Sequence, residues 1–189
     1  MKSAGKKVLF ISLLFPVLLC LCACNVRSTR QLKQEAKLTY GPAKVVSESK
    51  SQNCNTVVLR DKLQGFEYTI TSSMKNLNVD NTSFGDWEST SCDFEIRLQE
   101  YVVTNARDDL DDICAKYHAT WKTPDYYTKD VLLKLSVEDA SDAKALGEEV
   151  ARLMQTQNLK NRMDGVVIYV QDTDENTLGQ VDLPGCIYK

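Results

Sequence analysis

Cys114 and His118 are the two side chains whose types and spacing most directly suggest chemistry. Residues four apart share one face of a helix, so this thiol could meet the single histidine of the chain. Such a pair can form a nucleophile and its base, or half of a metal site. Nucleophilic catalysis needs a nucleophile, a base and an oxyanion site together, and the sequence does not indicate this combination. It also contains no Gly-x-Ser-x-Gly elbow of a serine hydrolase. We therefore assign no catalytic residue, no metal ligand and no cofactor.

The segment from Asp172 through Asp174 to Asn176 begins like a calcium-binding loop. Such a loop needs glycine at its sixth position and glutamate at its twelfth. Thr177 and Leu183 stand at those positions, so the segment is better explained as a hairpin turn.

Trp121, Tyr126 and Tyr127 flank Pro124 between a predicted helix and a predicted strand. Exposed aromatic rings on such a loop can stack on sugars or on peptide side chains. The alternative is that they close one end of the hydrophobic core. The three aromatic residues are the candidate ligand-binding residues of this sequence.

The first 24 residues have the composition of an export signal. Three lysines precede a run of uncharged, mostly apolar residues over 8–23, which ends in Leu21-Cys22-Ala23-Cys24. A membrane-spanning helix needs about 20 apolar residues, and this run has 16 with Pro16 inside it. Ordinary signal cleavage after Ala23 is also possible, but Leu21 is large where a small residue is preferred.

A small residue followed directly by cysteine explains the end of this run as a lipobox, and in this it resembles the bacterial lipoprotein class. The resemblance covers only the export signal. It implies that Cys24 carries acyl chains and that residues 1–23 are removed. The chain would then be held on the extracytoplasmic face of the cell membrane, or on the periplasmic side in a cell with an outer membrane.

The charge balance of the remaining 166 residues excludes one class of partner. Residues 1–23 contain three lysines and no acid, so the rest of the chain has 20 basic and 26 acidic side chains and a net charge of −6. Binding to nucleic acid needs a basic face, so we expect no nucleic-acid partner. The expected partners are the membrane, through the lipid, and an envelope protein or glycan.

Four cysteines follow Cys24, and an even number in an exported domain predicts two disulfides. The alternative is buried free thiols. If one helix spans 93–118, the Cα atoms of Cys92 and Cys114 are about 33 Å apart, which is too far to pair, whereas a break at Asn105 would remove this exclusion. With one helix, the pairings would be Cys54–Cys92 with Cys114–Cys186, or Cys54–Cys114 with Cys92–Cys186.

Hydrophobic periodicity predicts the elements that must position these residues. Apolar residues recur every three or four positions over 93–118 and 141–157, which predicts two helices. We favour one continuous helix over 93–118, although a break near 104–105 would let Asn105 cap a second helix and would place Asp108, at the start of the acidic run 108–112, in its first turn. That run is interpreted as a solvated helix face. Stretches that are rich in β-branched residues or that alternate between apolar and polar residues predict strands at 56–59, 66–74, 131–137, 166–170 and 178–183.

The resulting order is β-β-α-β-α-β-β, typical of an α+β protein. We expect a two-layer sandwich, with two helices on one face of a mixed, mainly antiparallel sheet. The segment 131–170 is long enough for a parallel strand–helix–strand crossover. Gly147 lies at the edge of the apolar stripe of its helix and allows close packing there.

The expected organisation is a signal peptide over 1–23, a polar tether over 24–52 and a single α+β domain over 53–189. The polar, Asn- and Ser-rich stretch 75–91 is expected to be a loop.

The function expected from these features is that of a non-enzymatic binding or accessory lipoprotein of the cell envelope. One alternative is an envelope-directed hydrolase in which acids such as Glu67, Asp86 or Glu138 converge with the aromatic residues. Another is a structural or immunity-type protein that covers the surface of a partner.

Overall fold

The computed structural model describes residues 26–79, 82–124, 130–156, 162–163, 165–183 and 185–189. The fold is α+β, as the sequence predicts, but the chain divides into two compact units. The first ends at Asp93, and the second spans Phe94–Lys189. Within the described residues, no helix combines the length and the apolar character that a bilayer crossing requires.

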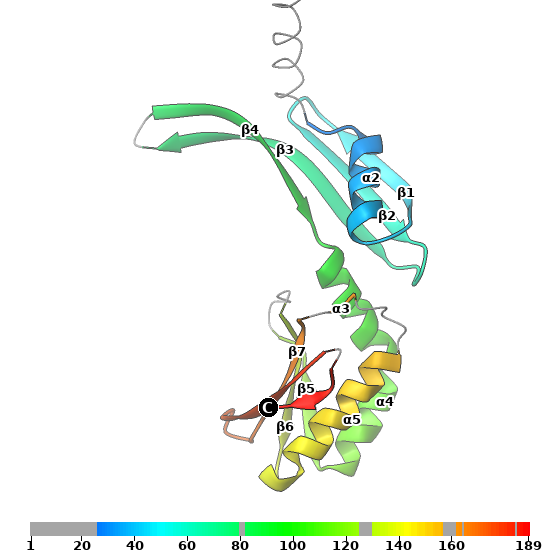
Figure 1. Cartoon of the computed structure of the whole chain (residues 1–189), viewed down its shortest axis with the longest axis vertical. Helices are drawn as coiled ribbons and strands as arrows, with labels where there is room; N and C mark the ends of the chain where they lie inside the picture. Colours follow the sequence, from blue (N-terminus) through cyan, green and yellow to red (C-terminus); the bar gives the residue numbers. More distant parts are fainter. Residues whose placement is uncertain (1–25, 80–81, 125–129, 157–161, 164, 184) are drawn as a thin grey trace, which may run out of the picture. The chain divides into compact units, whose positions relative to one another are not determined.

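The first unit is one helix against a four-stranded antiparallel sheet (Figure 1). The strands follow each other in chain order, so each pairs with its sequence neighbours. The elements are α2 (Thr29–Thr39), β1 (Ala43–Lys50), β2 (Cys54–Asp61), β3 (Glu67–Val79) and β4 (Thr82–Cys92). The face of β2 that meets α2 buries Val57 and Leu59 completely.

Helix α2 and strand β1 lie where the sequence analysis expected a polar tether, so that prediction is wrong for residues 29–50. Ser28 caps the helix: its hydroxyl accepts from the Gln31 backbone N–H, and the Gln31 side chain accepts from the Ser28 N–H. Leu32 and Ala36, four residues apart, are fully buried against the sheet. The segment is polar because only this narrow stripe is buried.

Strands β3 and β4 continue as a two-stranded ribbon beyond the sheet (Figure 1). The β2–β3 pairing ends at Ser73, whereas the β3–β4 pairing continues to Val79 opposite Thr82. This ladder occupies residues 75–79 and 82–91, where the sequence predicts a loop. The residues of this stretch are mostly polar and lack an alternating apolar pattern, so composition alone did not indicate a strand.

The second unit is built on a five-stranded sheet in the order β5-β6-β7-β8-β9. Helices α4 and α5 lie side by side on one face of it (Figure 1). The helical elements are α3 (Phe94–Asn105), α4 (Arg107–Lys116), the 3₁₀ turn η1 (Ala140–Asp142) and α5 (Ala143–Thr156). The strands are β5 (Ala119–Lys122), β6 (Val131–Val137), β7 (Val167–Gln171), β8 (Thr177–Asp182) and β9 (Ile187–Tyr188).

The helix expected over 93–118 is broken at Ala106, so the prediction of one continuous helix is wrong. Ala106 has φ −97° and ψ 5°, outside the helical range, and no side chain caps the helix that follows. Asp108 and Asp109 fall in the first turn of α4, where the helix dipole favours acids. The alternative prediction, a break near 104–105, is therefore close to what the structure has.

Strands β6 and β7 are parallel and are joined through α5, which confirms the predicted crossover. The side chains of α5 that face the sheet include Leu146, Val150 and Met154, all fully buried. Gly147 is in close contact: a Cβ there would lie 2.9 Å from Val181 and 3.0 Å from Val170.

The predicted order of elements and the single domain over 53–189 are not what the structure has. Strands β1, β4, β5 and β9 and helix α2 were missed, and the boundary between units falls at Asp93. The polar strands lack the periodic pattern on which strand prediction depends. The short strands β5 and β9 lie at the two edges of their sheet.

Candidate functional site

A left-handed turn at His118 brings α4 and β5 together. Tyr117 closes the helix, and the His118 N–H donates to the Ala115 carbonyl at 3.3 Å. His118 has φ +49°, a conformation that histidine tolerates better than most residues, and its side chain is exposed. The chain then enters β5 at Ala119 and runs back alongside α4.

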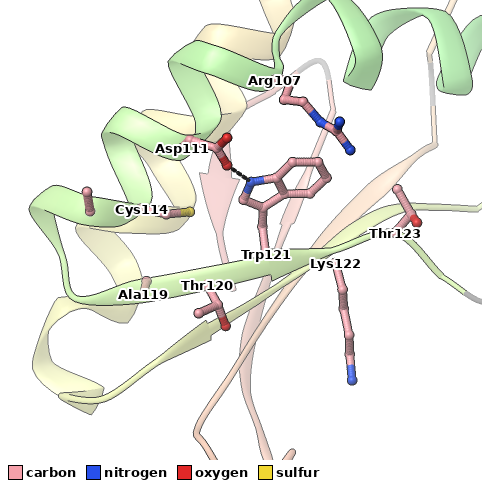
Figure 2. A pocket seen from close by; sticks show the side chains of 9 residues that line it. Arg107, Asp111, Cys114, Ala119, Thr120, Trp121, Lys122 and Thr123 are labelled. Atoms are coloured by element: carbon pink, nitrogen blue, oxygen red, sulfur yellow. Dashed lines mark hydrogen bonds between the residues drawn. The ribbon is translucent and has the colours of Figure 1, made fainter.

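The space between α4 and β5 is an open groove of about 620 Å³ (Figure 2). Helix α4 contributes Arg107, Asp111 and Cys114 to its wall. The strand side is formed by residues 119–123. We call this the Trp121 groove, because the half-buried indole of Trp121 lies at its centre.

The Trp121 ring is held in place by two side chains of α4. Its indole N–H donates to Asp111 Oδ1 at 2.6 Å, and the Arg107 guanidinium carbon lies 5.9 Å from the ring centroid. Arg107 and Asp111 are four residues apart and therefore share a helix face. Figure 2 shows the indole between these two groups.

The sequence predicts Trp121 as a candidate ligand-binding residue but indicates neither of its two partners. Asp111 was assigned to a solvated run, and it is exposed along with Asp108, Asp109 and Asp112. The one signal for its role was the spacing of Arg107, Asp111 and Cys114 on one face of a helix. The other two candidate ligand-binding residues, Tyr126 and Tyr127, lie outside the described residues.

Cys114 and His118 do not form a reactive pair in this structure. Cys114 is buried, whereas His118 is exposed at the turn. Burial, together with the charge of Asp111, raises the pKa of the Cys114 thiol to about 11. The thiol is therefore protonated at neutral pH, which is the opposite of what a nucleophile requires.

The segment 172–176 is a hairpin turn between β7 and β8, as predicted. The Asp172 carboxylate accepts from the Asp174 and Asn176 backbone N–H groups at 2.9 and 2.8 Å and from the Asn176 amide. These bonds lower the pKa of Asp172 and stabilise the turn. Among the described residues no group of three or more His, Cys, Asp or Glu side chains could hold a metal ion.

The predicted disulfides are not present: none of the four described cysteines, Cys54, Cys92, Cys114 and Cys186, is part of a disulfide. Cys54 pairs with Ser73 and Cys92 with Ile70, three residues apart on β3, so the two thiols point to opposite faces of the sheet. This excludes a Cys54–Cys92 bond without rearrangement of the strands. Cys186 lies in the turn before β9, where burial raises its pKa. Cys24 lies outside the described residues.

Glu67 and Asp86, two of the acids named for a hydrolase, do not converge. Glu67 binds Arg60 at the start of β3, whereas Asp86 binds Asn76 on the ribbon, about 30 Å further along the strand. Glu138 is exposed after β6, in the second unit.

No protein-family model, curated protein or solved structure is significantly similar to this chain.

Proposed function

We propose that this chain is a lipid-anchored binding module of the bacterial cell envelope that recognises a glycan in the Trp121 groove. The anchor is supported by the leader: a basic start, a short apolar run and a small residue before Cys24. Two or more acyl chains on one cysteine hold a protein stably on a membrane.

The preformed geometry of Trp121 is the observation that carries the binding function. The half-exposed indole is fixed by Asp111 and Arg107 before any ligand arrives, so little ordering is needed on binding. Its remaining ring surface faces an open groove, where the apolar side of a sugar ring can stack.

The polar groups around the indole suggest the class of glycan. Arg107 can form a charge-assisted hydrogen bond with a carboxylate, and the hydroxyl of Thr123, on the same side of the strand as Trp121, can bond to a sugar hydroxyl. We therefore propose a glycan that bears carboxylate groups as the ligand.

A hydrolase is less well supported. Glycoside hydrolysis by acid–base chemistry uses two carboxyl groups flanking the bond. Of the described residues that line the Trp121 groove, Asp111 is the one carboxylate, and it is engaged by the indole.

Binding can be measured by the fluorescence of Trp121 in a Trp87→Phe variant, where Trp121 is the single tryptophan. We expect saturable quenching or shift on titration with carboxylate-bearing cell-wall glycan fragments. Trp121→Ala, followed by calorimetry, should weaken binding about tenfold or more, which corresponds to about 1.4 kcal/mol. Trp87→Phe should leave the affinity unchanged. Equal affinity of the Trp121→Ala variant would contradict the site.

The anchor is tested by intact-mass spectrometry of the protein extracted from membranes. We expect the mass of the chain from Cys24 with added acyl groups. A Cys24→Ala variant should move to the soluble fraction. A native product without acyl groups at Cys24 would contradict the proposed location.

A further inference from the structure

Arg27, three residues after the proposed lipidation site, is bound to the sheet of the first unit by several contacts. The Arg27 N–H donates to Ser72 Oγ at 2.9 Å, and the Arg27 carbonyl accepts from the fully buried Asn55 amide at 2.8 Å. The Arg27 side chain pairs with Glu88 at 3.2 Å and with Glu35. Arg27 is therefore clamped to strands β2, β3 and β4.

This clamp limits the distance between the first unit and the proposed lipid anchor. Only Asn25 and Val26 separate Arg27 from Cys24, so the Cα atoms of Cys24 and Arg27 are at most about 10–11 Å apart. A chain acylated at Cys24 thus holds this end of the first unit at the membrane surface.

The same end of the sheet carries an exposed tryptophan. Trp87 directly precedes Glu88, the partner of Arg27, and is 50% exposed. It pairs with Lys75 across the β3–β4 ladder, and the Lys75 ammonium lies 6.0 Å from the ring centroid. Both side chains lie on the face of the sheet opposite α2. Strand β4 is at the edge of the sheet, and residues 24–27 are long enough to run past this edge from one face to the other.

We propose that Trp87 and Lys75 contact the headgroup region of the lipid bilayer when Cys24 is acylated. Tryptophan is amphipathic and favours the boundary between headgroups and acyl chains. The neighbouring ammonium can bind lipid phosphates. The inference rests on the lipid anchor of the proposed function and adds an orientation: the first unit lies on the bilayer through the base of its ribbon.

The test uses the acylated full chain in vesicles of anionic phospholipid with brominated acyl chains. In a Trp121→Phe variant, Trp87 is the single tryptophan, and we expect its emission to shift to the blue and to lose most of its intensity. Lys75→Glu in the same chain should reduce the quenching, because it replaces attraction to phosphate by repulsion.

A matched control places the reporter at the other end of the same sheet. Leu63, 47% exposed, follows β2 at the end about 20 Å away from Asn55. A chain with Trp87→Phe, Trp121→Phe and Leu63→Trp should show no quenching.

Mass spectrometry of the same samples separates the two proposals. Acylated Cys24 with an unquenched Trp87 would overturn the orientation and leave the anchor intact. Equal quenching of the reporters at positions 87 and 63 would also overturn the orientation. Absence of acyl groups would overturn both.

Discussion

Single side chains in this protein act mainly by holding other groups in place. Asp111 and Arg107 position the indole of Trp121, and Arg27 joins the start of the fold to three strands. Glu88 is central to the contacts around Arg27: besides pairing with Arg27, its carboxylate accepts hydrogen bonds from the Ser72 and Thr90 hydroxyls at 2.8 and 2.7 Å. Burial by itself raises the pKa of Glu88, but these bonds and Arg27 lower it on balance.

Glu88→Gln should therefore destabilise the first unit in a pH-dependent way. A carboxylate whose pKa is lowered by folding stabilises the fold above its unfolded pKa of about 4.3, and this contribution is lost as the pH falls through the folded value. We expect a loss of about 1–2 kcal/mol at pH 7 that shrinks on acidification below about pH 4. Denaturant unfolding at several pH values measures it.

Glu48→Gln is the control for this experiment, because Glu48 is exposed on β1. It should change stability by less than about 0.5 kcal/mol at every pH. A Glu88→Gln effect that does not depend on pH would contradict the ionised role of Glu88.

At the scale of elements, helix propensity and close packing favour different residues at one position of α5, Gly147. Glycine in a helix is normally about 1 kcal/mol less favourable than alanine. Gly147 lies where α5 packs against β7 and β8, and a Cβ there would lie within 3.0 Å of Val170 and Val181. Close packing of helix on sheet thus outweighs helix propensity at this position.

Gly147→Ala should lower the stability of the second unit by about 1–3 kcal/mol, because the added methyl overpacks the contact with β7 and β8. Thermal or denaturant unfolding measures the change. Ala145→Gly is the matched control, since Ala145 is exposed on the same helix and should lose only about 1 kcal/mol through propensity. A gain of stability in Gly147→Ala would show that the helix can shift to admit the methyl.

At the scale of the whole molecule, the chain has two apolar cores. The first unit buries Leu59, Tyr68 and Ile70 beneath α2, and the second buries a larger set between α5 and its sheet. Under the proposed anchor, the two units have different roles: the first is held at the membrane, and the second carries the Trp121 groove.

Leu59→Ala and Leu135→Ala test whether the cores respond separately. Each side chain is fully buried, in β2 and β6 respectively, so each change should cost about 2–5 kcal/mol. Hydrogen exchange should increase mainly in β1–β4 for the first variant and mainly in β6–β8 for the second. A uniform increase over both units in either variant would show that they unfold together.

Much of the second unit could be predicted because its strands bury alternating or continuous apolar residues and its long helix buries one stripe. Strand β6, helix α5 and the hairpin turn at 172–176 were all recognised for this reason. In the first unit, the Ser28 and Gln31 spacing is that of a capping box and could have predicted the start of α2. The polar composition of the segment favoured a tether instead. The ribbon gave no comparable signal, because its residues are mostly polar and lack the alternating apolar pattern of a strand that packs on a core.

The sequence by itself determined the α+β class, the parallel crossover through α5 and the turn after β7, because each follows from a local pattern of burial or turn chemistry. It also supplies the basis for expecting a lipid on Cys24. Only the tertiary structure decided the division at Asp93, the clamp on Arg27 and the meeting of Arg107, Asp111 and Trp121. These depend on strand pairing and on the direction of one turn at His118, which join residues that no local pattern connects.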